Sequence, residues 1–159
     1  MRLMYLLAVL VYVFVPTVYG YPSGAPIEAC ESLTPRHGKN QPQPSRYSPF
    51  KITQSTDQYA PGDVVTVKIR GSRDHSFSGF FVKAYDPATG APIGKFQDGK
   101  GLKIYNSETC SGATHSDNVR KRGAVLVWEA PQSKGRVAFK VTVLKRFSEF
   151  YTNLEPSLE

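Results

Sequence analysis

Alternation of apolar and polar residues is the feature of this sequence that most constrains its fold. From Phe50 onward, short alternating runs follow one another, and turn-forming sequences rich in Gly, Pro and Asp separate them. In one run Val65, Val67 and Ile69 share one face of a strand, and the residues between them are polar or basic. No stretch shows a convincing helical period. The pattern therefore predicts an all-β chain folded as an antiparallel β-sandwich.

We expect six or seven short strands in a single domain, and six segments carry the strand signal. The segment 77–86 is apolar on both faces, as expected for a strand inside a sandwich. The segments 124–130 and 136–145 are expected to pair directly as an antiparallel hairpin. Trp128 shares a face with Leu126, which favours a place in the core over a carbohydrate-stacking platform. The six segments are 50–53, 63–71, 77–86, 101–106, 123–131 and 135–146.

Residues 1–20 have the layout of a secretory signal peptide. A basic start at Arg2 is followed by an apolar run, then by Pro16 and the small residue Gly20. The alternative, an uncleaved anchor helix, is disfavoured because the run is shorter than the ~20 residues of a membrane span. We therefore expect a secreted, extracellular protein without stable membrane insertion, whose single domain covers residues 21–159.

Two cysteines, Cys30 and Cys110, fall within the expected mature chain. In an oxidising compartment we expect two such cysteines to form one disulfide. The alternative is a reactive or metal-binding thiol, which is disfavoured because neither cysteine belongs to a CxxC pair. Cys30 lies in a stretch rich in Pro, Gly and Ser, residues 21–49, which we expect to be irregular chain.

The body of the chain is strongly basic. Residues 33–148 contain 19 Lys and Arg against 8 Asp and Glu, a net charge of +11. Such a charge on a secreted protein favours anionic surfaces, including bacterial lipopolysaccharide, teichoic acid, sulfated glycans and anionic lipid. Nucleic acid fits the same charge but is disfavoured by the signal peptide. The expected partners are therefore extracellular polyanions.

Five basic residues are the candidate ligand-binding residues. Arg120, Lys121 and Arg122 precede the strand that contains the tryptophan, so we expect them on an exposed loop. Lys134 and Arg136 come from the next turn, which lies at the opposite end of the predicted hairpin. An Arg side chain can hold phosphate bidentately, whereas Lys acts as a point charge. The alternative for each of the five is an ordinary solvated surface charge.

The sequence shows no arrangement typical of catalysis or metal binding. His37, His75 and His115 are far apart and lie outside HExxH or HxE contexts, so we expect no metal site. His115 is interpreted as a loop histidine whose ring bonds the backbone near the cysteine. The chain also lacks a GxSxG elbow and a glycine-rich phosphate loop, and its carboxylates are scattered singly. We therefore expect a non-enzymatic protein without a cofactor.

Taken together and in order, several segments resemble the reeler domain. The resemblance implies an immunoglobulin-like sandwich in which Cys30 is bonded to Cys110. The chain departs from the family at one point. Phe150 and Tyr151 follow the last predicted strand, at a place where the family often has a Trp. We expect packing to survive this change. The segments are GAPIEAC, YAPGDVVTVKIRG, FSGFFVKAYD, GKF, a cysteine followed by THS, VLVWEAP and GRVAFKVTVL, and they cover essentially the whole mature chain.

A single reeler domain behind a signal peptide is similar to the small insect defence proteins of the noduler type. This similarity implies a haemolymph protein that binds microbial surface polymers and the haemocyte surface in innate immunity. Our leading hypothesis is a secreted defence protein that binds lipopolysaccharide, lipoteichoic acid or β-glucan and promotes an antibacterial nodulation response. Its mechanism would be multivalent electrostatic contact, which salt screens.

Three other functions were considered for a chain of this kind. An extracellular-matrix adhesion module that binds sulfated glycans is the first alternative, since larger reeler-domain proteins suggest it. A membrane-lytic protein is disfavoured because no amphipathic, membrane-seeking segment lies outside the signal peptide. An enzyme is the least favoured of the three.

Overall fold

The computed structural model describes residues 21–159, and the predicted signal peptide lies outside the described residues. The described chain is built almost entirely from short strands. They are β1 (Phe50–Gln54), β2 (Gln58–Tyr59), β3 (Val64–Gly71), β4 (Gly79–Tyr85), β5 (Lys95–Phe96), β6 (Leu102–Asn106), β7 (Ser111–His115), β8 (Gly123–Glu129), β9 (Gly135–Arg136), β10 (Ala138–Arg146), β11 (Glu149–Leu154) and β12 (Ser157–Leu158).

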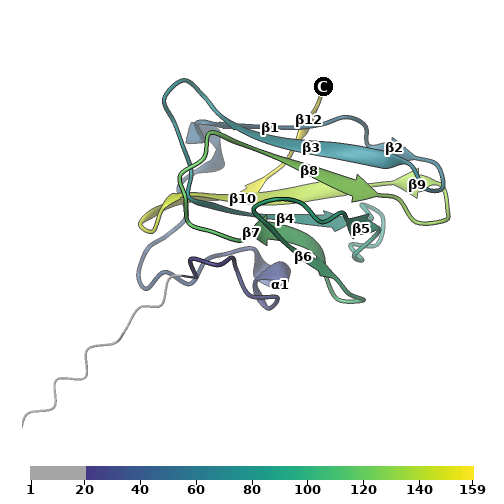
Figure 1. Cartoon of the computed structure of the whole chain (residues 1–159), viewed down its shortest axis with the longest axis horizontal. Coiled ribbons are helices and arrows are strands. Elements are labelled where there is room, and N and C mark those ends of the chain that lie inside the picture. The colour runs from purple at the N-terminus through teal and green to yellow at the C-terminus, as the bar shows by residue number, and fades with distance from the viewer. Residues whose placement is uncertain (1–20) are drawn as a thin grey trace, which may run out of the picture.

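Two five-stranded sheets pack face to face, as Figure 1 shows. The β3 sheet has the strand order β12-β1-β3-β8-β5, and the β4 sheet has the order β11-β10-β4-β7-β6. The strands β2 and β9 form a separate two-stranded ribbon. Neighbouring strands run antiparallel except β1 and β12, which are parallel. The predicted antiparallel β-sandwich is therefore confirmed.

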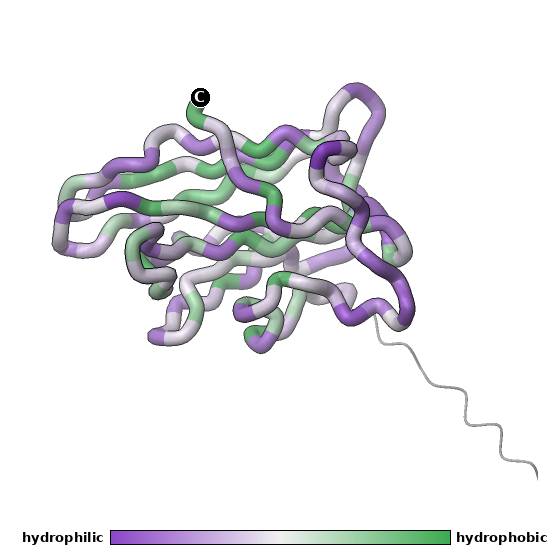
Figure 2. Tube along the Cα trace, turned by 180° about the vertical axis from the view of Figure 1, so that it is seen from behind, coloured by the Kyte–Doolittle hydropathy of each residue, from purple (hydrophilic) through white to green (hydrophobic). Residues whose placement is uncertain are grey.

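The alternation seen in the sequence places apolar side chains between the two layers. Figure 2 shows hydrophobic and hydrophilic residues alternating along the strands, with mostly hydrophilic residues in the turns. Burial of these side chains is the main favourable contribution to folding. The fully buried members of this core include Val65, Val67, Ile69, Leu126, Trp128, Val82, Phe139, Val141 and Val143.

Trp128 lies in the core, as predicted, and is fully buried. Its indole Nε1 donates a hydrogen bond to the carbonyl oxygen of Ile93 at 2.9 Å. Tyr59 and Phe139 meet the ring edge-on, with centroid distances of 5.3 Å and 6.0 Å. Gly94 adopts a positive φ of 62° against the indole, where a Cβ atom would lie 2.1 Å from the ring. A side chain at this position would therefore displace the tryptophan.

The predicted direct pairing of residues 124–130 with 136–145 is wrong. Strand β8 pairs with β3 and β5, whereas β10 pairs with β4 and β11. The connection between β8 and β10 crosses from one layer to the other, and within it β9 pairs with β2. Trp128 of β8 and Phe139 of β10 meet across the core. Pairing the two strands in one sheet would remove that contact between the layers.

The sandwich has more strands than the six or seven predicted. Strand β7 escapes prediction because all five of its residues are buried, so no apolar–polar alternation marks it. Strand β11 was expected to be a trailing segment and instead forms an edge of the β4 sheet. Phe150 and Tyr151 are both buried on opposite faces of β11, since Tyr151 meets Phe50 in the main core and Phe150 meets His37 of the N-terminal segment. Their expected packing is thus confirmed.

The N-terminal segment, residues 21–37, crosses the outer face of the β4 sheet. Residues 21–49 are irregular, as predicted, apart from the helical turn α1 (Ala29–Ser32) and a 3₁₀ turn over Ser45–Tyr47. Cys30 of α1 is bonded to Cys110, so the predicted disulfide is confirmed. Leu33 and Phe81 pack beside it in a second buried cluster. Within residues 21–159, no helix is long and apolar enough to span a membrane.

Candidate functional site

The tribasic segment, Arg120–Arg122, lies just before β8 at one end of the sandwich. Both of its arginines contact the loop between β3 and β4. The Arg120 guanidinium donates two hydrogen bonds to Ser76 Oγ, at 2.9 Å and 2.7 Å. The Arg122 guanidinium forms an ion pair with Asp74 at 2.8 Å, although its side chain stays 67% exposed. Both arginines therefore hold a neighbouring loop.

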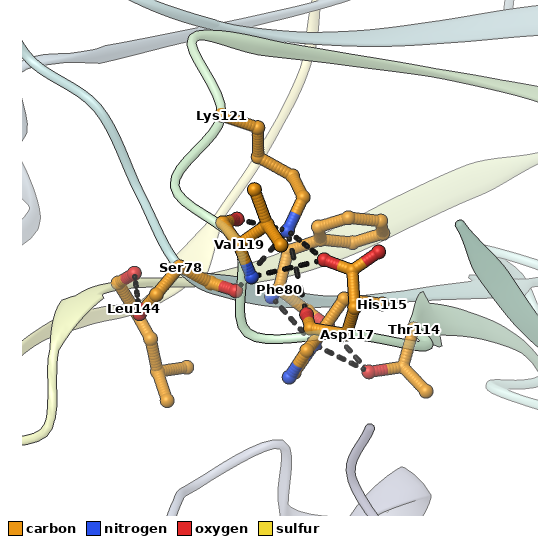
Figure 3. Close-up of polar contacts among 8 residues, drawn as sticks. All are labelled: Ser78, Phe80, Thr114, His115, Asp117, Val119, Lys121 and Leu144. Carbon is orange, nitrogen blue, oxygen red and sulfur yellow. Dashed lines mark hydrogen bonds and ion pairs between the residues drawn. The ribbon is translucent and has the colours of Figure 1, made fainter. Parts of the chain in front are cut away.

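Figure 3 shows the Lys121 ammonium in contact with several polar groups of the surrounding chain. Its Nζ donates to the carbonyl oxygen of Val119 at 2.7 Å and to that of Ser78 at 3.3 Å. It also forms an ion pair with Asp117 at 3.2 Å, and only 20% of its side chain is exposed. The hydrogen bond from Lys121 holds the pKa of the Asp117 carboxyl below its ordinary value. The Lys121 ammonium is consequently directed toward its own chain.

His115 lies at the end of β7 and is 6% exposed, so its predicted place in a loop is wrong. The predicted bonding of its ring to the backbone is confirmed. Its Nδ1 lies 3.1 Å from both the nitrogen and the oxygen of Phe80, and 3.1 Å from Thr114 Oγ1. The ring occupies the space beside Gly79, where a Cβ would lie 2.6 Å from it. Burial lowers the pKa of His115, which favours the neutral ring.

Lys134 and Arg136 lie beyond the other end of β8. Strand β8 has seven residues, a length of roughly 23 Å, so these two cations are remote from the tribasic segment. The Arg136 guanidinium forms an ion pair with Asp57. Lys134 is exposed, and no ion pair involves it within residues 21–159. The structure therefore divides the five candidate residues into two groups at opposite ends of the sandwich.

A third group of cations, which the sequence analysis missed, lies on the outer face of the β4 sheet. Lys83 of β4 stands directly opposite Lys140 of β10. Their neighbours Val82 and Val141 point into the core, so both lysines point outward. Like charges in such a cross-strand pair are destabilising, by roughly 0.2–1 kcal/mol on the scale of such pairs. The fold therefore keeps an unfavourable contact at this position.

Two tyrosines and a further lysine extend this group. The Lys140 Nζ lies 5.5 Å from the ring centroid of Tyr85, and the Lys103 Nζ lies 5.4 Å from that of Tyr105. The register aligns Lys83 with Gly112 of β7, and Gly112 with Tyr105 of the edge strand β6. We call this set the lysine row. Its members are Lys83, Lys103, Lys140, Tyr85 and Tyr105.

The charge of the lysine row is largely uncompensated. In the described part of the chain, no carboxylate lies within ion-pairing distance of Lys83, Lys103 or Lys140. Glu155 is near enough that its charge, together with the larger effect of burial, raises the pKa of Tyr85. One acid therefore borders a row of three cations. Alternation in the sequence could place Lys83 and Lys140 outward, but only the strand register shows that they are neighbours.

The chain was compared with known families and proteins. A family model described as the Reeler domain matches residues 28–158. "Putative ferric-chelate reductase 1" of Danio rerio is 29% identical over 149 residues, which are 88% of this chain and 25% of that protein. The chain thus spans about a quarter of the length of this relative. "Putative defense protein 3" of Antheraea mylitta is 30% identical over 136 residues, which are 82% of this chain and 80% of that protein.

Solved structures show the same fold. The crystal structure of the human F-spondin reeler domain aligns with a TM-score of 0.59 at 22% sequence identity. The alignment covers 78% of this chain and 91% of that chain. The immunoglobulin-like sandwich and the β4 sheet that carries the lysine row thus belong to a known architecture.

Proposed function

This chain belongs to the Reeler domain family, and we propose that it is a secreted defence protein that binds anionic microbial surface polymers through the lysine row. Lipopolysaccharide, lipoteichoic acid and β-glucan are the proposed ligands, of which the first two carry charge. The proposed setting is the haemolymph, and the proposed consequence is microbial clumping and nodulation involving the haemocyte surface. Binding changes no covalent bond.

The observation that carries this proposal is the direct opposition of Lys83 and Lys140. Two half-buried lysines that stand opposite each other in adjacent strands carry like charges, which repel, and an anion between them would remove the repulsion. A phosphate or carboxylate group placed there would relieve the repulsion and contact both lysines. The flanking rings of Tyr85 and Tyr105 offer apolar surface and hydroxyl groups to the sugar units between successive charges.

The insect relatives support a role in defence. The chain covers 80% of the Antheraea mylitta protein named above and 81% of "Putative defense protein" of Bombyx mori. Similarity over most of both chains is the reason for carrying that role to this protein. A polymer presents many equal charges, so a weak site can still hold a cell surface through repeated engagement.

The test is a binding measurement on whole bacteria and yeast with purified, oxidised protein of residues 21–159. Lipopolysaccharide, lipoteichoic acid, β-glucan and heparin serve as soluble competitors. We expect microbial polymers to displace the protein and heparin to be the weaker competitor. Binding should also fall between about 0.1 M and about 1 M salt, as the Debye length shortens from about 10 Å to about 3 Å.

A matched pair of variants locates the binding surface. Lys83→Gln with Lys140→Gln and Arg120→Gln with Arg122→Gln each remove two positive charges, so they change the net charge equally. We expect the lysine variant to bind about tenfold more weakly, or about 1.4 kcal/mol, and the arginine variant to remain close to the native protein. Displacement by heparin alone would favour matrix adhesion through sulfated glycans, and absence of binding to any microbe would refute the defence role.

A further inference from the structure

A pocket of about 810 Å³ lies between the N-terminal segment and the outer face of the β4 sheet. This volume falls within the range of small-molecule sites, about 300–1,000 Å³. Apolar side chains form most of its wall. Figure 3 shows the Leu144 side chain directed toward the N-terminal segment. We call it the apolar pocket, and its main apolar residues are Pro26, Ala29, Leu33, Phe81, Leu144 and Phe147.

The N-terminal wall of the pocket is fixed at several points. The disulfide at Cys30 anchors its first part. Thr142 Oγ1 donates a hydrogen bond to the carbonyl oxygen of Leu33 at 2.6 Å. Within the lining of the pocket, the His37 ring stacks on Phe147 at a centroid distance of 4.2 Å, and its Nδ1 lies 2.9 Å from the carbonyl oxygen of that residue. The pocket is therefore preformed, which reduces the entropy lost on binding.

Small residues leave the space between these anchors open. Ala25 and Ala29 line the pocket and carry only a methyl side chain. Pro35 also lines the pocket and has no backbone N–H. This part of the chain therefore cannot pair with the β4 sheet as a regular strand. At the far end, the Phe147 side chain remains 42% exposed. A long, flexible hydrocarbon fits these surroundings better than a polar sugar does.

The mouth of the pocket indicates the charge of the ligand. Arg36 lines the pocket and is exposed, and within residues 21–159 it has no ion-pair partner. Glu28 is the one acid among the lining residues. The surrounding chain, residues 33–148, carries a net charge of +11. An amphiphile with an anionic head is therefore complementary to the pocket, with its head at Arg36 and its tail inside.

We propose that the apolar pocket binds the acyl chain of a phosphate-bearing amphiphile from a microbial surface. The microbial source rests on the proposed function, whereas the chemistry of the ligand rests on the pocket. The protein then has two contacts for a molecule such as lipoteichoic acid. The lysine row holds the polyanion, and the pocket holds the lipid end.

Calorimetric titration with hexyl, octyl and decyl phosphate tests the pocket directly, with inorganic phosphate as the probe for the head group alone. We expect the affinity to rise about fourfold for each added methylene that is buried. Leu144→Trp should fill the pocket and weaken decyl phosphate binding at least tenfold. Val125→Trp, at a 57% exposed apolar residue of the β3 sheet, is the control and should bind like the native protein.

Two further measurements keep the outcome decisive. Phe147→Ser changes an exposed position and should weaken decyl phosphate binding several-fold even if Leu144→Trp fails to fold. The proposal would be overturned if the affinity for the alkyl phosphates did not depend on chain length. It would also be overturned if Leu144→Trp and Phe147→Ser both folded and both bound decyl phosphate like the native protein. Deacylated lipoteichoic acid separates the two contacts, since it should bind the Leu144→Trp protein normally and bind the Lys83→Gln, Lys140→Gln protein weakly. Normal binding of deacylated lipoteichoic acid to the Lys83→Gln, Lys140→Gln protein would overturn the role of the lysine row and leave the pocket standing.

Discussion

The tribasic segment and the lysine row are both positively charged, but their cations differ in whether they have bonding partners within the protein. Arg120 and Arg122 are bonded to a neighbouring loop, and the Lys121 ammonium is surrounded by oxygen atoms of its own chain. Lys83 and Lys140 face each other across two strands, without a carboxylate partner in the described chain. Cations that are adjacent in the sequence are thus used to hold the fold, whereas cations brought together by register remain available.

This contrast shows that a high density of basic residues in a sequence does not mean that their side chains are free to bind a ligand. A basic run on a loop can bond to the carbonyl groups and acids that the same loop supplies. A lysine in the middle of a strand has no such local partners, because its sequence neighbours point to the other face. The contrast can be tested through the stability of the protein as well as through its ligands.

The largest expected effect comes from removal of the disulfide between Cys30 and Cys110, which fixes the N-terminal segment. Cys30→Ser with Cys110→Ser should lower the free energy of unfolding by about 3 kcal/mol, measured by urea denaturation. Polymer binding at a temperature where the variant is folded should change little, because the lysine row is on the strands. An equally stable variant, or a folded variant that no longer binds polymer, would contradict this separation.

Lys121→Met should have the next largest effect. The substitution leaves Asp117 and two backbone carbonyl groups without their donor, so we expect unfolding to become easier by about 2 kcal/mol. Lys134→Met removes an exposed cation and should change stability by no more than about 0.5 kcal/mol. Thermal and urea unfolding of both variants measure the difference. Equal values would show that Lys121 is an ordinary surface charge.

Acid should destabilise the end of the sandwich that carries the tribasic segment. His115 has a lowered pKa in the folded protein, so the unfolded chain binds more protons once the pH falls below about 6.5. Stability should therefore be complete above that pH and decline below it. The decline should be smaller in His115→Gln and unchanged in His75→Gln, a control at a half-buried histidine of the loop between β3 and β4. An NMR titration of His115 above its ordinary pKa would contradict the expected sign.

The smallest effect should come from relieving the repulsion in the lysine row. Lys83→Gln or Lys140→Gln alone should each stabilise the protein by about 0.3 kcal/mol, and the second substitution should add little to the first. The gain should disappear at about 1 M salt, where exposed charges are screened. A double-mutant cycle measures this coupling. Additive effects, or a loss of stability, would mean that the two ammonium groups do not repel each other.

The sequence was sufficient for the elements whose local pattern reflects their burial. Val65, Val67 and Ile69 alternate because one face of β3 meets the core and the other meets solvent. Trp128 was predicted correctly for the same reason. Strand β7 was missed because the N-terminal segment covers its second face, and His115 was misplaced in a loop with it. A pattern of alternation cannot report a strand that is buried on both sides.

The candidate site depended on information that no local pattern contains. The position of β8 in one sheet and β10 in the other sets which strands are neighbours. Because β8 and β10 lie in different sheets, the predicted direct hairpin is wrong, and Lys140 of β10 lies beside Lys83 of β4. The five predicted ligand residues were chosen for their charge and for their expected place on exposed loops. The ion pairs of Arg122 with Asp74 and of Arg136 with Asp57 join loops that only the fold brings near, whereas Lys121 pairs with Asp117 of its own loop.

The two walls of the apolar pocket differ in how freely they can change. One wall is part of the β4 sheet, so its residues also form backbone hydrogen bonds between strands and support the core behind them. The other wall is irregular chain anchored at Cys30 and His37, and the residues between these anchors contribute little to the main hydrophobic core. Apart from the buried Leu33, substitutions there can accumulate at low cost to folding. The domain thus resembles a display scaffold, in which a short variable segment can acquire new ligands during evolution or in a randomised library.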